Sequence, residues 1–116
     1  CPGGMPGSQN LAESQMLCEM LIDHNKKGGR IAAICAAPAV VLAPLGLLEG
    51  HQATCYPGFE SACQGATMVN SRVVKSGNII TANGPSSAFD FAMAIIEETM
   101  GAEVAATIAR DTLYNA

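Results

Sequence analysis

One cysteine stands where the local sequence favours a reactive side chain. Residues 30–38, Arg-Ile-Ala-Ala-Ile-Cys-Ala-Ala-Pro, place Cys35 between a short apolar run and a second apolar run that opens with Pro38. This pattern predicts a buried strand that turns sharply into a helix, because proline is favoured in the first turn of a helix. Ala33 and Ala37, two residues before and after the cysteine, are both small, as the tight turn of a nucleophile elbow requires.

An elbow would favour the ionised form of the Cys35 thiol. Its side chain would lie at the carboxyl end of a strand and at the positive end of a helix dipole, which stabilises an anion. A thiol in that position ionises more readily than a free one, and the thiolate is the form that attacks electrophiles. We therefore expect Cys35 to be the residue that carries function.

The other four cysteines have weaker signals. Cys18 falls on the apolar face of an expected helix and Cys1 at the end of an expected strand, so both are interpreted as structural. Cys55 could approach Cys35 and act as a resolving thiol, provided that their Cα atoms lie within about 7 Å. Cys63 falls in an expected loop or edge strand and has no assigned role.

Composition sets the limits for the whole chain. Its 116 residues, 49% hydrophobic and 14% charged, predict a single domain that spans residues 1–116. Six basic and ten acidic residues leave a net charge of −4, which argues against a nucleic-acid or membrane-surface partner. No apolar run approaches the ~20 residues of a membrane-spanning helix. Five cysteines without a CxxC pair argue against a zinc site or a disulfide framework, and favour a reducing, cytoplasmic setting.

Helical and strand patterns alternate along the chain. The first expected helix has a capping box at Asn10 and Glu13 and ends at Gly28. The remaining expected helices are 38–45, 88–100 and 103–110, and the expected strands are 31–34, 52–56, 72–75 and 78–81. This alternation predicts an α/β domain with a mostly parallel sheet. Because the chain opens on a turn, Cys-Pro-Gly-Gly, we expect it to be a piece of a longer domain or a cleavage product.

Several of these motifs occur together and in order in one known family. They are Pro2-Gly3-Gly4, Gln9-Asn10-Leu11, the elbow at 32–38, Gly84-Pro85, and the helical runs 89–97 and 103–106. The chain therefore resembles the DJ-1/PfpI (ThiJ) superfamily, in its DJ-1-like branch, without the N-terminal part of the family fold. The resemblance implies a flavodoxin-like three-layer sandwich, incomplete at the N-terminus, that usually forms a homodimer.

The resemblance also implies a set of site residues. Cys35 matches the family's reactive cysteine, and Gly4 and Ala36 match positions whose backbone N–H groups form an oxyanion hole. Tyr56 and Pro57 would line the pocket, with Tyr56 where the family's namesake has a histidine. A phenol donates a hydrogen bond but is a poor base near neutral pH. The glutamate that tunes the family's cysteine belongs to the N-terminal portion, so a separate N-terminal segment is an expected partner.

The activity that the resemblance implies is cofactor-independent chemistry on reactive dicarbonyls. In a glyoxalase or deglycase of this type, Cys35 would convert methylglyoxal to lactate without a metal; neither His24 nor His51 has the spacing of a metal ligand. The alternative is a redox-sensing stress protein or chaperone that works through oxidation of Cys35. A PfpI-type peptidase is disfavoured, because that branch has a histidine where this chain has Ala36. No residue supports a role in thiazole monophosphate biosynthesis.

Overall fold

The computed structural model describes residues 1–114. The strands are β1 (Ile31–Ile34), β2 (Gln52–Ala53), β3 (Thr67–Met68), β4 (Val73–Ser76) and β5 (Ile79–Ala82). The longer helices are α1 (Gly7–Ala12), α2 (Gln15–Lys26), α3 (Ala88–Met100) and α4 (Ala102–Asp111). Short helical turns cover η1 (Pro38–Leu42), η2 (Ala43–Leu45), η3 (Glu60–Ala62) and η4 (Pro85–Ser87).

The main sheet has three strands in the order β1-β5-β4. β5 lies parallel to β1, with Ile31 opposite Ile79, and antiparallel to β4. The expected hairpin is confirmed, and Gly77 takes the left-handed conformation at its turn (φ +57°), which glycine adopts without strain. β2 and β3 form a separate parallel pair. Most strand pairs are thus parallel, as the sequence predicted.

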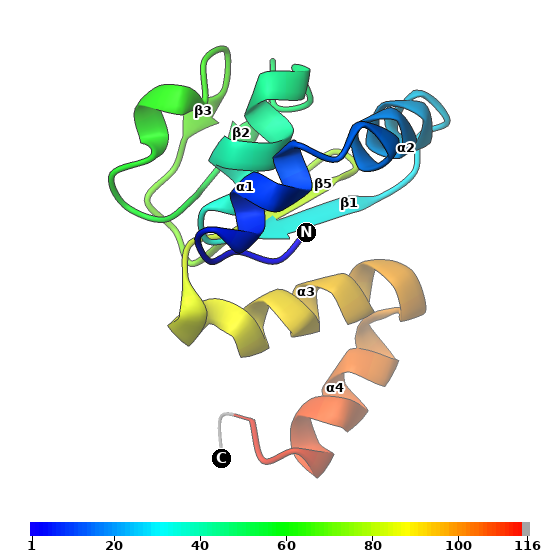
Figure 1. Cartoon of the computed structure of the whole chain (residues 1–116). Coiled ribbons are helices and arrows are strands. Elements are labelled where there is room, and N and C mark those ends of the chain that lie inside the picture. The colour runs from blue at the N-terminus through cyan, green and yellow to red at the C-terminus, as the bar shows by residue number, and fades with distance from the viewer. Residues whose placement is uncertain (115–116) are drawn as a thin grey trace.

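Helices cover both faces of the main sheet. α3 packs along one face, while α1 and η1 lie on the other, and α4 continues from α3 away from the sheet (Figure 1). All four residues of β5 are buried, which is typical of a central strand covered on both faces. The largest fully buried side chains include Leu42, Leu48 and Ile79, so the core lies between the sheet and the η1 side. This is the mixed α/β arrangement that the sequence pattern predicted, and it agrees with the flavodoxin-like fold that the resemblance implied.

The two strand sets are joined by side-chain hydrogen bonds. The buried Thr81 hydroxyl accepts a hydrogen bond from the backbone N–H of Thr54 at 3.0 Å. The Ser76 hydroxyl accepts one from the N–H of Gln52 at 3.1 Å and also contacts His51 Nδ1 at 3.0 Å. The segment after β2 is therefore held against the carboxyl end of β5, close to the elbow.

Two sequence predictions need correction. The expected first helix is broken into α1 and α2, and the N-cap of α2 is Ser14, whose hydroxyl accepts from the N–H of Leu17 at 3.2 Å. The Asn10 capping box is therefore wrong, because Asn10 lies inside α1. The expected strand 52–56 is shorter, with only Gln52–Ala53 in β2. The last two helices and β1 agree with prediction within a few residues.

Within residues 1–114, no helix combines the length and the apolar character needed to cross a bilayer.

Candidate active site

Cys35 lies between β1 and the helical turn that leads into η1. Its backbone is left-handed, with φ +66°, a conformation that costs a non-glycine residue free energy. Ala36 and Ala37, which follow it, are buried, and Pro38 opens η1. The sharp strand-to-helix turn predicted at Cys35 is therefore present. Its thiol is free and partly exposed.

Gly3 packs directly against the elbow. A Cβ built on Gly3 would lie 2.6 Å from the Cβ of Cys35, 2.9 Å from the carbonyl oxygen of Ile34 and 3.3 Å from the Cys35 sulfur. Only a residue without a side chain fits so close to the elbow. The first segment of the chain is also tied to β1, because the N–H of Ile34 donates to the carbonyl oxygen of Cys1 at 3.2 Å.

The turn that contains Gly4 is anchored by Ser8, a residue that the sequence reasoning missed. Ser8 is fully buried; its N–H donates to the carbonyl oxygen of Gly4 at 2.8 Å and its hydroxyl to that of Pro2 at 3.3 Å. Gly4 itself is exposed and left-handed, with φ +82°. The available signal was the serine's position inside α1, where a hydroxyl can bond to the backbone of the preceding turn.

The two N–H groups assigned to an oxyanion hole belong to Gly4 and Ala36. Within residues 1–114, neither group donates to a backbone or side-chain acceptor. Both residues neighbour Cys35: Ala36 follows it in the chain, and Gly4 follows Gly3, which touches it. An oxyanion-stabilising site requires backbone donors that no protein acceptor already occupies.

Tyr56 and Pro57 lie beside the elbow. The N–H of Tyr56 donates to the carbonyl oxygen of Cys35 at 2.8 Å. The Tyr56 ring is 45% exposed, packs edge-to-face on Phe59 with centroids 6.4 Å apart, and lies against Gly84. The phenol is thus held at the rim of the elbow by its ring contacts.

A pocket of about 260 Å³ lies next to the elbow. It is lined by Thr54, Cys55, Pro57, Glu60, Met68, Val69, Asn70 and Asn83. Two of its lining residues are next in sequence to residues that hydrogen-bond to the Cys35 backbone. Pro57 follows Tyr56, and Asn83 follows Ala82. Cys35 itself does not line this pocket.

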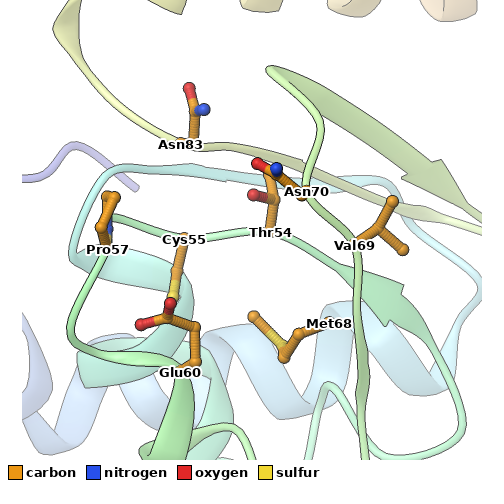
Figure 2. Close-up of a pocket in the computed structure, with 8 residues that line it drawn as sticks. All are labelled: Thr54, Cys55, Pro57, Glu60, Met68, Val69, Asn70 and Asn83. Carbon is orange, nitrogen blue, oxygen red and sulfur yellow. The ribbon is translucent and has the colours of Figure 1, made fainter.

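The floor of the pocket holds a second thiol group. In Figure 2 the Cys55 side chain and the Glu60 carboxylate point toward each other, with Met68 nearby. Burial raises the pKa of Cys55 to about 12, and the adjacent Cys63 thiol and Glu60 carboxylate add to the increase. Burial likewise raises the pKa of Cys63. Cys63 lies in the loop that follows η3, as the sequence predicted, but it is buried and close to Cys55.

Among residues 1–114, no group of three or more His, Cys, Asp or Glu side chains has the arrangement of a metal site. His24 Nε2 contacts the carbonyl oxygen of Arg30 at 3.0 Å, and His51 contacts Ser76.

The chain is similar in sequence to proteins of one known family. The model of the DJ-1/PfpI family matches residues 1–98. The chain is 44% identical over 110 residues to the Parkinson disease protein 7 homolog of Danio rerio, covering 92% of the chain and 58% of that protein. It is 39% identical over 103 residues to the glutathione-independent glyoxalase DJR-1.2 of Caenorhabditis elegans, covering 88% of the chain and 54% of that protein.

Solved structures show the same relationship. The structure of oxidized DJ-1 from Toxoplasma gondii matches with a TM-score of 0.93 and 44% identity, over 98% of this chain and 62% of that one. The chain thus spans a little over half the length of each of these three relatives.

Proposed function

The chain belongs to the DJ-1/PfpI family, and from that premise we propose that Cys35 is a nucleophile that acts on reactive dicarbonyls such as methylglyoxal. The observation that carries the proposal is the left-handed backbone of Cys35 at the strand-to-helix turn, as in a nucleophile elbow. Cys35 is partly exposed there. The glyoxalase DJR-1.2 among its relatives supports this substrate class.

The first step would be attack of the Cys35 thiolate on the aldehyde carbon. A C–S bond forms, and the carbonyl electron pair moves to oxygen, which the N–H groups of Gly4 and Ala36 would stabilise. Protonation of that oxygen gives a hemithioacetal.

The second step would move hydrogen between the two adjacent carbons. The proton on the former aldehyde carbon is removed and returned to the former ketone carbon, which yields a thioester of lactate on Cys35. Water then hydrolyses the thioester, releasing lactate and the free thiol. Tyr56, at the rim of the elbow, would donate a hydrogen bond to the ketone oxygen. In a deglycase reaction, an amine adduct would enter the same early steps.

The test is lactate formation from methylglyoxal by the purified chain. We expect turnover in the wild type, loss of at least about a hundredfold in Cys35→Ala, and no change in Cys18→Ala. Cys18 is the matched control, because it is also a partly buried free thiol but lies on α2. Absence of lactate from a folded wild-type chain, or equal turnover in Cys35→Ala, would overturn the proposal.

A second candidate function is redox sensing through Cys35. It is favoured by the partly exposed Cys35 and by the uncommitted N–H groups of Gly4 and Ala36, which would suit a sulfinate oxygen as well as an oxyanion. The test is addition of oxygen by dilute hydrogen peroxide, mapped by mass spectrometry. Selective oxidation of Cys35 over the other four cysteines supports a sensor role, and equal oxidation of all five rejects it.

Assembly and location complete the proposal. We expect residues 1–116 to act as the C-terminal portion of the family fold, as a homodimer in the cytoplasm, with a small carbonyl substrate and a separate N-terminal segment as a further partner. Light scattering on the purified chain measures the oligomeric state, and a monomer at all concentrations would reject the dimer.

A further inference from the structure

Cys55 and Cys63 form a buried pair of thiols outside the Cys35 site. They are 4% and 3% exposed and belong to the same buried apolar cluster. Each thiol influences the pKa of the other, so the two side chains are close together within this cluster. Their proximity is therefore a feature of the buried core and not of two surface side chains.

Two successive turns bring the pair together. The N–H of Phe59 donates to the carbonyl oxygen of Tyr56 at 3.2 Å, and the N–H of Cys63 donates to that of Glu60 at 3.0 Å. The chain therefore folds back after Cys55, and Cys63 returns to it at the end of η3. A disulfide between two such neighbours requires their Cα atoms to lie within about 7 Å of each other.

We propose that Cys55 and Cys63 are a redox-active dithiol that a small disulfide of the glutathione class oxidises to an intrachain disulfide. The Cys55 thiolate attacks one sulfur of the small disulfide, forms a mixed disulfide and releases one small thiol. Cys63 then attacks the Cys55 sulfur, closes the Cys55–Cys63 bond and releases the second small thiol. Two protein thiols lose two electrons and two protons, and the small disulfide becomes two thiols.

The pocket gives the two thiols an order of reaction. Cys55 lines the pocket and Cys63 does not, so Cys55 is the entry point for a small molecule and Cys63 resolves the mixed disulfide. Because burial disfavours both thiolates, oxidation is slow near neutral pH. The same burial leaves the reduced pair without thiolate stabilisation, which favours a persistent disulfide once it forms.

The chain's glutamates allow a direct test. Cleavage after Glu13, Glu19, Glu49, Glu60 and Glu97 puts each cysteine into its own peptide. The folded 116-residue chain is equilibrated with oxidised and reduced glutathione, quenched in acid, alkylated and digested without reduction. We expect the dominant cross-linked species to join peptide 50–60 to peptide 61–97, while peptides 1–13 and 14–19 keep alkylated cysteines and Cys35 in peptide 20–49 carries either an alkyl group or glutathione, with no link to another peptide. Reduction before digestion should abolish the link.

Three variants separate this proposal from its alternatives. Cys63→Ala should leave Cys55 as a glutathione mixed disulfide, since the resolving thiol is gone. Cys35→Ala should close the Cys55–Cys63 bond as the wild type does, which also makes failure here distinguishable from failure of the dicarbonyl proposal. Cys18→Ala is the neutral control. A dominant link between peptides 20–49 and 50–60, or full alkylation of Cys55 and Cys63 in oxidising buffer, would overturn the proposal. The peptide map of the wild type tests the Cys55–Cys63 disulfide without any variant, so the proposal remains testable if a variant fails to fold.

Discussion

The backbone N–H of Tyr56 donates a 2.8 Å hydrogen bond to the carbonyl oxygen of Cys35. On its other side, the N–H of Cys35 donates to the carbonyl oxygen of Ala82 in β5 at 2.9 Å. Both backbone polar groups of the elbow residue are therefore engaged by neighbouring segments. A left-handed conformation at a non-glycine residue persists only where the surroundings hold it, and these two bonds supply that constraint.

The cost of the elbow can be measured at Cys35 itself. Glycine adopts a φ of +66° without the Cβ clash, so Cys35→Gly should be more stable to denaturant than Cys35→Ala by ~1 kcal/mol. Urea unfolding of the two variants, neither of which has a thiol at this position, isolates the backbone effect. If Cys35→Ala proves as stable as Cys35→Gly, the elbow is not strained.

The close packing of Gly3 predicts a second effect. Gly3→Ala would force a methyl group to within 2.6 Å of the Cys35 Cβ and 2.9 Å of the Ile34 carbonyl oxygen. We expect a loss of ~1–3 kcal/mol in the free energy of unfolding, as for other overpacked sites. We also expect a changed rate of iodoacetamide labelling at Cys35, because the elbow must shift.

Gly7→Ala is the matched control for that variant. Gly7 is the first residue of α1, and a Cβ built there would meet no atom within 4 Å. Alanine in place of glycine should therefore leave stability unchanged or raise it by up to about 1 kcal/mol. Equal behaviour of Gly3→Ala and Gly7→Ala in unfolding and labelling would contradict the packing of Gly3 on the elbow.

Local sequence chemistry predicted the parts of the fold that depend on near neighbours. The turn at Cys35 follows from small alanines and Pro38, and the hairpin follows from Gly77 between two apolar runs. The helix Ala88–Met100 follows from its apolar period and the glycine that ends it. Each of these signals lies within a few residues of the element it specifies, so no tertiary information was needed.

Other features depend on distant segments and were not predictable. The contact of Cys55 with Cys63 arises from the fold-back through η3 and from core packing, and no spacing rule identifies it. The anchoring of the Gly4 turn by Ser8 requires the turn to be in place first. The two-residue strand β3 is too short to leave a periodic pattern and exists because it pairs with β2.

The corrected helix start supplies a third prediction. Ser14 caps α2 through the N–H of Leu17, so Ser14→Ala should lower the free energy of unfolding by ~1 kcal/mol. Asn10→Ala should have a much smaller effect, because Asn10 is an exposed residue within α1 and not a cap. Circular dichroism during urea unfolding compares the two variants. A larger loss of stability for Asn10→Ala than for Ser14→Ala would contradict Ser14 as the helix cap and support the capping box at Asn10.

The buried thiol of Cys55 makes stability depend on alkaline pH. In the unfolded chain this thiol titrates near its ordinary value of 9.0, whereas in the folded chain burial, helped by Cys63 and Glu60, raises its pKa to about 12. Between these values the folded state holds a proton that the unfolded state has lost, so stability falls as pH rises. The contribution is fully present below pH 9 and disappears as pH approaches 12. Cys63, whose pKa burial also raises, contributes with the same sign.

Comparison with Cys55→Ala isolates this contribution, because every other ionisable group is common to the two proteins. Under a phosphine reductant, which keeps all thiols reduced, the urea midpoint of the wild type should fall more steeply than that of Cys55→Ala from pH 8 to pH 11. The wild-type urea midpoint, measured relative to that of Cys55→Ala, should therefore decrease steadily from pH 8 to pH 11. A difference that stays constant would mean that Cys55 is as accessible to hydroxide in the folded chain as in the unfolded one. In that case the packing of Cys55 against Cys63 at the pocket floor would be wrong.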